Sequence, residues 1–181
     1  MSVPALLAAL LAVACAVAAD EPAPLGACGP IARRYDVVEL PGAQLRGLGG
    51  TAVERIGLVA FRAGRATPIP FQIDEKRGRK IALDQGKEPT PDDKPGVLDA
   101  EDLVVFLPCD AGERAADGAA PGGAREIRLE DPLTHAIGFV YLVVDEHPVA
   151  SERRYVRYDA ANDFVDHTWI GTPRRPVASG A

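Results

Sequence analysis

The sequence predicts an all-β fold, an antiparallel β-sandwich, with a β-barrel-like arrangement as the alternative. Short apolar segments follow one another at fairly even spacing, and no long segment shows the period of a helix. The 18 glycines and 16 prolines favour short elements joined by many turns. A chain of 181 residues suits one domain, which we expect over residues 34–171.

The first half of this domain contains four strand candidates. The first has β-branched residues at its centre and stops at Pro41. The third carries two prolines, which predict an edge strand, and its Ile69, Phe71 and Ile73 share one face. The four candidates are residues 34–40, 56–62, 66–74 and 79–84.

The second half contains five more candidates. The first of them, LVVFLPC, is continuously apolar between acidic residues and a proline, which predicts a strand buried on both faces. The next one alternates, and we expect Ile127 and Leu129 to point inward. The candidates are residues 103–109, 125–131, 137–146, 153–159 and 164–171.

The N-terminal segment, residues 1–19, is apolar, uncharged in its side chains and ends in small residues at Ala19. These features predict a signal peptide and hence export to the periplasm or the cell surface. The alternative is a lipoprotein signal, LAVAC, with lipid attachment at Cys15. No later segment is apolar enough to span a membrane. We expect a Pro/Gly/Ala-rich leader at 20–33 and an unstructured tail at 172–181.

Three cysteines are present, and Cys15 belongs to the N-terminal segment. In an exported chain the remaining pair, Cys28 and Cys109, predicts a disulfide, and two separate thiols are the alternative. No C-x-x-C motif occurs, which argues against a structural zinc site and against a redox pair.

The formal net charge of −6 argues against nucleic acid as a partner, and the arginine pairs are scattered as expected for solvated surfaces. The histidines are far apart, and no serine lies in a G-x-S-x-G motif. We therefore assign no catalytic residue from the sequence.

The segment DDKPGVLDAEDLVVF, residues 92–106, has two interpretations. With Gly96 at the sixth position of an EF-hand-like loop, acids fall at some of the calcium-ligand positions. Two other ligand positions are Pro91 and Pro95, which carry no side-chain oxygen. The alternative is an acidic turn, capped by one of the acids, that leads into a buried strand. The candidate calcium ligands are Asp93, Asp99 and Asp102.

A carbohydrate-binding surface is a further hypothesis. Aromatic side chains on a sheet face can stack on a sugar ring, although they more often pack in a core. Acids near Asp74 and Asp99 would be the basis of a hydrolytic variant of this hypothesis, because glycosidases use a carboxylate pair. The candidate ligand-binding residues are Asp74, Tyr155 and Trp169.

Several phrases occur in a characteristic order: VERIGLVAFRAGRATPIPFQIDE, GVLDAEDLVVFLPCDAGERA, DPLTHAIGFVYLV and YVRYDAANDFVDHTWIG. Together they resemble a group of exported proteobacterial proteins that commonly contain PIPFQIDE, GxLDxxDELVFM, DAGDRA and GWVYLF. The resemblance covers roughly residues 50–171 and implies a β-rich exported protein, without implying an activity.

From the sequence we expect an exported module without catalysis, with a structural or ligand-binding role in the bacterial cell envelope. The alternatives are a carbohydrate-active module, binding or hydrolytic, and a small interaction domain stabilised by calcium. The sequence identifies no partner; a carbohydrate and an envelope protein are the candidates, and calcium is the one cofactor considered.

Overall fold

The computed structural model describes residues 27–83, 87–159 and 164–167. Its strands are β1 Val38–Pro41, β2 Ile56–Arg62, β3 Arg65–Pro68, β4 Phe71–Asp74, β5 Lys76–Arg77, β6 Lys80–Ile81, β7 Leu103–Phe106, β8 Arg125–Glu130, β9 Ile137–Val144, β10 Val156–Asp159 and β11 Phe164–His167. Its short 3₁₀ helices are η1 Gly42–Gln44, η2 Val53–Arg55 and η3 Pro108–Asp110. None of the helices in these ranges has the length and apolar character that crossing a bilayer requires.

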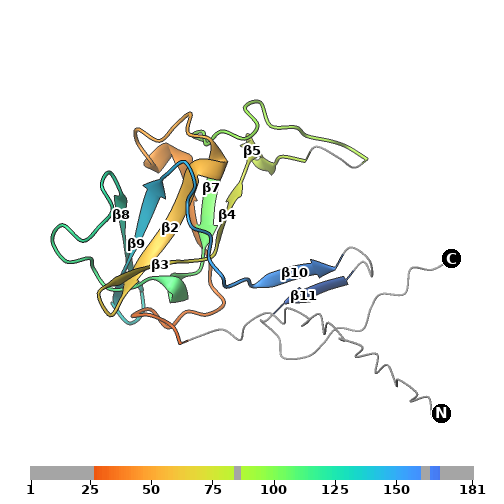
Figure 1. Cartoon of the computed structure of the whole chain (residues 1–181). Coiled ribbons are helices and arrows are strands. Elements are labelled where there is room, and N and C mark those ends of the chain that lie inside the picture. The colour runs from red at the N-terminus through yellow and green to blue at the C-terminus, as the bar shows by residue number, and fades with distance from the viewer. Residues whose placement is uncertain (1–26, 84–86, 160–163, 168–181) are drawn as a thin grey trace, which may run out of the picture.

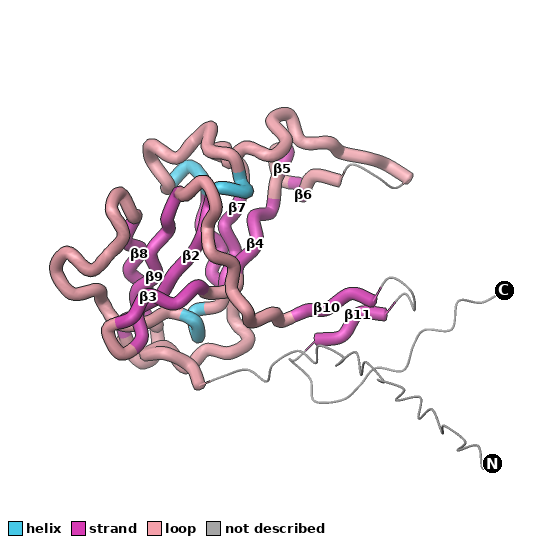
Figure 2. The backbone as a smooth tube through the Cα atoms, viewed as in Figure 1, coloured by secondary structure: helices cyan, strands magenta, loops and turns pink. Residues whose placement is uncertain are grey.

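Two antiparallel sheets form the body of the molecule (Figure 1). One has the strand order β3-β2-β9-β8 and the other the order β1-β7-β4. Across the described ranges no sheet closes on itself, so the barrel-like alternative is wrong and the all-β, antiparallel prediction is confirmed. Two small hairpins, β5-β6 and β10-β11, lie beside the body, and loops make up much of the remaining chain (Figure 2).

A common apolar core is built from both sheets. β2 contributes Leu58, β9 contributes Val140 and Leu142, and β7 contributes Val104 and Phe106, all of them buried. Residues two apart on a strand point to the same side, and this places alternate side chains of each strand in the core. The predicted inward pair Ile127 and Leu129 of β8 packs against the same cluster, as expected.

The segment predicted as one strand over 66–74 is two strands in different sheets. β3 pairs with β2 and β4 pairs with β7, and the chain passes from one sheet to the other at Ile69 and Pro70. Pro70 has no N–H to offer a ladder, which suits this break between strands. Both strands are at a sheet edge, as the prolines predicted.

The segment 103–109 is also shorter and less buried than predicted. The strand ends at Phe106, and η3 begins at Pro108. Val104 and Phe106 are buried, whereas Leu103 and Val105 are half-buried on the other face, so the prediction of burial on both faces was wrong. Val105 lies between Glu39 of β1 and Gln72 of β4, a polar setting typical of an outward sheet face.

Other predicted strands begin or end at different residues in the structure. The candidate 79–84 contributes only Lys80–Ile81, and 34–40 becomes Val38–Pro41. In the candidate 153–159 the strand starts at Val156, which leaves Tyr155 in the preceding segment. The final candidate forms β11 up to His167, and its remainder lies outside the described residues.

The range expected to be a leader contributes to the folded body. Cys28 and Cys109 form the expected disulfide, which confirms that prediction. Ile31 is 1 % exposed and faces Gly138 of β9. Residues 1–26, which include the expected signal peptide and Cys15, lie outside the described residues.

Candidate functional site

A groove of about 480 Å³ runs along one end of the sheet β1-β7-β4. Its floor is mainly apolar and includes Ile69 and Phe71 from the β3–β4 crossing and Val105 from β7, together with the polar Gln72 of β4. The opposite wall is the segment 150–156, which leads into β10. The groove therefore combines an apolar floor with a wall that carries polar and cationic groups. The wall residues are Ala150, Ser151, Arg153, Arg154, Tyr155 and Val156.

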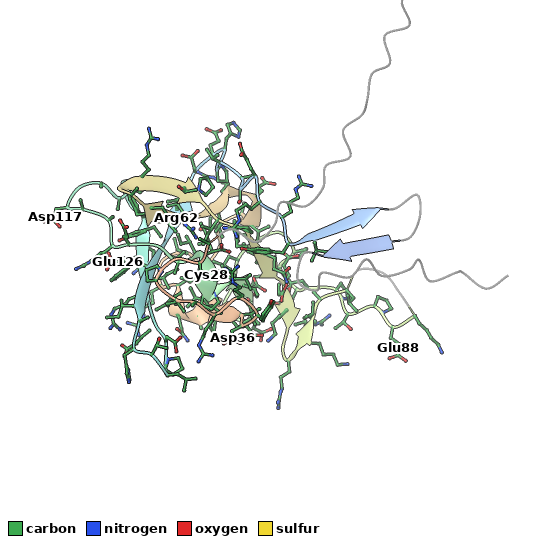
Figure 3. All side chains as sticks on the ribbon, turned by 90° about the horizontal axis from the view of Figure 1, so that it is seen from below. Cys28, Asp36, Arg62, Glu88, Asp117 and Glu126 are labelled. Carbon is green, nitrogen blue, oxygen red and sulfur yellow. A yellow bond between two sulfur atoms is a disulfide. The ribbon has the colours of Figure 1, made fainter. Side chains whose placement is uncertain are left out.

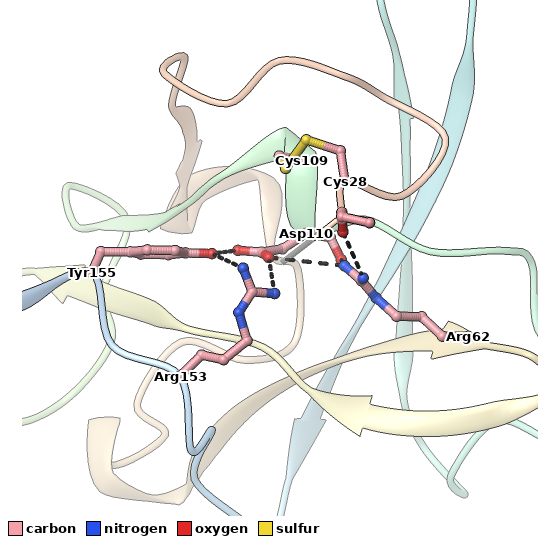
Figure 4. The surroundings of a disulfide bond; sticks show 7 residues. Cys28, Arg62, Cys109, Asp110, Arg153 and Tyr155 are labelled. Atoms are coloured by element: carbon pink, nitrogen blue, oxygen red, sulfur yellow. Dashed lines mark hydrogen bonds and ion pairs between the residues drawn. A yellow bond between two sulfur atoms is a disulfide. The ribbon is translucent and has the colours of Figure 1, made fainter. Parts of the chain in front are cut away.

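A buried carboxylate fixes this wall (Figure 4). The Asp110 side chain, at the end of η3, is 0 % exposed. Its Oδ1 accepts a hydrogen bond from Arg153 Nη1 at 2.8 Å, and its Oδ2 accepts one from the Tyr155 hydroxyl. A buried carboxylate is costly unless it is paired and hydrogen-bonded, and here both oxygens are engaged. Asp110 thus attaches the segment 150–156 to the body.

Arg62 of β2 completes the cluster on the other side of Asp110. Its Nη2 lies 3.9 Å from Asp110 Oδ1 and donates to the Asp110 backbone carbonyl at 3.3 Å. Its Nη1 donates to the carbonyl of Ala27 at 3.1 Å. One arginine therefore connects β2, η3 and the N-terminal segment.

Tyr155 has a phenol whose pKa is raised well above its usual range. Burial is the main cause, because it disfavours the phenolate, and the hydrogen bond to the anionic Asp110 adds to it. The hydroxyl consequently keeps its proton to higher pH than that of an ordinary tyrosine and acts as a donor to Asp110. The Arg153 guanidinium lies 5.6 Å from the centre of the Tyr155 ring, which adds a cation–π contact.

The disulfide lies directly beside this cluster. Cys109 precedes Asp110 in η3, and its carbonyl accepts a hydrogen bond from Gly29 N at 2.9 Å. A Cβ on Gly29 would come within 1.8 Å of the Ala111 carbonyl oxygen, so this close approach requires glycine. The N-terminal segment is therefore held to η3 by a covalent bond and by a backbone hydrogen bond.

The acidic segment forms a closed turn at Asp99 and Asp102. Asp102 Oδ2 accepts from Asp99 N at 2.7 Å, and Asp102 Oδ1 accepts from Lys76 N at 2.9 Å. Asp99 Oδ1 accepts from Glu101 N at 2.8 Å, and its Oδ2 pairs with Lys94 Nζ at 3.1 Å. All four carboxylate oxygens are used within the protein, as the acidic-turn interpretation expects.

The surroundings shift the two carboxyl groups in opposite directions. The pKa of Asp99 is lowered, first by the hydrogen bond from the Glu101 amide and also by Lys94. The pKa of Asp102 is raised, mainly because burial disfavours its charged form. Asp102 is thus a structural carboxyl group that joins the turn to the start of β5.

The third candidate ligand, Asp93, is exposed and does not share this turn's hydrogen bonds. Its neighbour Asp92 is buried, and Asp92 Oδ2 has no hydrogen-bond partner there. Across the ranges that the structure describes, no group of three or more His, Cys, Asp or Glu is arranged to hold a metal ion. The residues present do not fit a calcium loop, because Asp99 and Asp102 are already engaged by amides and a lysine.

We expect Asp102→Asn to lower the free energy of unfolding by about 2 kcal/mol, because one buried amide would lose its acceptor. Urea unfolding followed by circular dichroism measures this change. Asp93→Asn is the matched control and should stay within about 0.5 kcal/mol, since its side chain is exposed.

We further expect EDTA to leave the melting temperature unchanged. A lower melting temperature with the chelator would contradict the closed-turn interpretation.

The candidate ligand-binding residues do not form one site. Tyr155 lines the groove, but Asp74 is not among the lining residues and instead accepts a hydrogen bond from Gln72 Nε2 at 2.7 Å. Trp169 lies outside the described residues. Sequence reasoning missed Asp110 and Arg62, and it assigned the arginine pairs, of which Arg153–Arg154 is one, to solvated surfaces. Only the three-dimensional structure brings these residues together, since they come from β2, η3 and the segment before β10.

No family model, curated protein or solved structure was found to match this chain. The groove and its wall are the features from which a function can be inferred.

Proposed function

We propose that this chain is an exported, non-catalytic β-sandwich module that binds an amphiphilic anion, a ligand with an aliphatic part and an acidic head group, in the groove beside Tyr155. The observation that carries the proposal is the apolar floor of the groove together with the arginines of its wall. Its volume of about 480 Å³ is in the usual range for small-ligand sites. The sandwich arrangement is supported by the core that both sheets share.

The two arginines of the wall have different roles in this proposal. Arg153 is bound to Asp110 and holds the wall in place. Arg154 is exposed, lines the groove and belongs to none of the ion pairs among the described residues. A guanidinium at the rim of an apolar groove suits a carboxylate or phosphate, which it can bind through two hydrogen bonds.

A sugar ligand is less well supported. Carbohydrate recognition needs polar side chains around an accessible aromatic face, whereas Gln72 is the one polar residue among the floor residues that the structure describes. The Tyr155 hydroxyl is bound to Asp110, and the ring faces Arg153. Asp74, the acid considered for this role, does not reach the groove.

Export remains part of the proposal. The apolar segment 1–19 has the pattern of a signal peptide, and the Cys28–Cys109 disulfide suits an oxidising compartment. The resemblance of residues 50–171 to exported proteobacterial proteins points the same way. The cell envelope is therefore the proposed location.

The proposal is tested by isothermal titration calorimetry with decanoate, decanol and decyltrimethylammonium, which share an aliphatic chain and differ in head-group charge. We expect decanoate to bind most tightly and N-acetylglucosamine not to bind. Arg154→Gln should weaken decanoate binding by about tenfold, the value of one charge-assisted hydrogen bond, and leave decanol binding unchanged.

Two more variants complete the test: Val105→Asp should block the groove, and Arg128→Gln is the control for Arg154→Gln. Val105 is half-buried in the groove floor, so a carboxylate there should abolish the binding of decanoate and decanol. Arg128 is an exposed cation of β8 that does not line the groove, and its replacement should have no effect. Equal binding of the three ligands, or a loss with Arg128→Gln as large as with Arg154→Gln, would contradict the proposal.

A further inference from the structure

A concentrated basic surface stands out on a chain whose net charge is −6. The hairpin β5-β6 and the residues that follow it, Lys76–Leu83, form a segment that we call the basic hairpin. It contains Lys76, Arg77, Arg79 and Lys80 and no acidic residue. The hairpin lies at the side of the body away from β8 (Figure 1), and long side chains project from it into solvent (Figure 3).

The pairing within the basic hairpin places like charges together. Arg77 and Lys80 are direct cross-strand partners in β5-β6, and both are exposed. Like charges directly opposite each other on a two-stranded ribbon are unfavourable. An anion outside the chain would relieve this repulsion.

Three neighbouring carboxylates, those of Glu75, Glu101 and Asp102, are already engaged by backbone amides. Glu101 Oε2 accepts from Gly78 N at 2.6 Å, and Asp102 Oδ1 accepts from Lys76 N. Glu75 Oε1 accepts from Gly96 N. These acids fix the base of the hairpin, and none of them forms an ion pair with its lysines or arginines among the described residues.

The same hairpin exposes two large aliphatic side chains. Ile81 and Leu83 are each 55 % exposed, and being two residues apart they point to the same side of the chain. Leu83 is held in extended conformation by two hydrogen bonds with Thr90, both 2.9 Å. Cations next to exposed aliphatic groups are the features with which peripheral proteins bind a bilayer surface.

We propose that the basic hairpin docks this protein onto an anionic lipid bilayer. Lys76, Arg77, Arg79 and Lys80 contact the lipid phosphates, and Ile81 and Leu83 enter the boundary between head groups and acyl chains. Long lysine and arginine side chains can reach head groups while the backbone lies at the interface. Nucleic acid fits less well, because single strands are bound through aromatic stacking and the basic hairpin has no aromatic residue.

Vesicle co-sedimentation of the full chain tests this proposal. We expect binding to vesicles of phosphatidylcholine with phosphatidylglycerol to exceed binding to phosphatidylcholine alone, and added salt to remove the difference. Arg77→Gln with Lys80→Gln should lower partitioning onto the anionic vesicles by about thirtyfold, given the usual contribution of each cation near such a surface. The uncharged segment 1–19 is the same in every variant and cannot produce this change.

The matched control is Arg55→Gln with Arg65→Gln, which removes two exposed cations outside the hairpin. It should change partitioning by less than about twofold. Ile81→Ser with Leu83→Ser should also weaken binding to anionic vesicles. The stability of every variant is compared with that of the wild type by urea unfolding. The effect of salt on vesicle binding by the wild type tests the proposal without any substitution.

Three results would overturn the proposal. One is equal binding of the wild type to neutral and anionic vesicles. Another is a loss with the control pair as large as with Arg77→Gln and Lys80→Gln, because net charge alone would then explain binding. The third is tighter binding to polyglutamate or duplex DNA than to vesicles, combined with unchanged binding after the two serine substitutions. This result would identify a polyanion, and not a bilayer, as the partner.

Discussion

Replacing Cys28 and Cys109 by alanine is expected to lower the free energy of unfolding by about 4 kcal/mol. The two cysteines are 81 residues apart, so the disulfide restricts a long loop of the unfolded chain. In the folded state the same bond holds the N-terminal segment against η3, where Gly29 N meets the Cys109 carbonyl. Urea unfolding followed by circular dichroism measures the loss, and the melting temperature should fall by about 10 °C.

Reducing the disulfide provides an independent measurement of the same quantity. A Cys15→Ala background removes the third thiol, so that the reductant acts on one disulfide. In that background the oxidised protein should keep the stability of the wild type. A melting temperature that does not respond to reduction would mean that the disulfide adds nothing to the stability of the folded state.

Asp110→Ala is expected to lower the free energy of unfolding by about 3–5 kcal/mol, the usual effect of removing one member of a buried ion pair. Asp110 is fully buried, and its loss would leave Arg153 and the Tyr155 hydroxyl without their acceptor. Asp117→Ala, which changes an exposed aspartate in the neighbouring loop, should stay within about 0.5 kcal/mol. An Asp110→Ala protein as stable as the wild type would contradict a structural role for the cluster.

The cluster also gives a pH dependence with a defined sign. The pKa of Tyr155 is raised in the folded state, so the folded protein holds this proton to higher pH than the unfolded chain. Its contribution to stability is therefore present below about pH 10 and is lost as the pH rises further. In Tyr155→Phe this part of the alkaline loss should disappear, and urea unfolding over that pH range shows whether it does.

Local patterns were enough to predict an all-β fold with antiparallel sheets and the disulfide. Alternation placed Ile127 and Leu129 correctly, and the prolines of 66–74 correctly indicated an edge. The break of that segment at Ile69–Pro70 was missed, because both halves keep a strand-like composition while their pairing partners differ. Val105 was assigned to the core because an apolar run does not reveal that one of its faces forms the floor of a groove.

The candidate site was mostly beyond sequence reasoning. Arg62, Asp110 and Arg153 lie far apart along the chain, and no spacing rule connects them. In the acidic segment, residue types suggested ligands, but hydrogen bonds to the amides of Asp99, Glu101 and Lys76 decide the role of its carboxylates. Tyr155 was singled out as an aromatic ligand-binding residue, and the structure places it in the groove wall with its hydroxyl turned to Asp110.

The position of the disulfide also determines how the module would carry a mechanical load. A pull on the chain ahead of Cys28 passes through the two sulfurs into η3 and bypasses residues 29–108. β1 through β7 all lie within that covalent loop. The edge strand β1 is consequently shielded from being unzipped by tension, which is borne by the chain that follows Cys109.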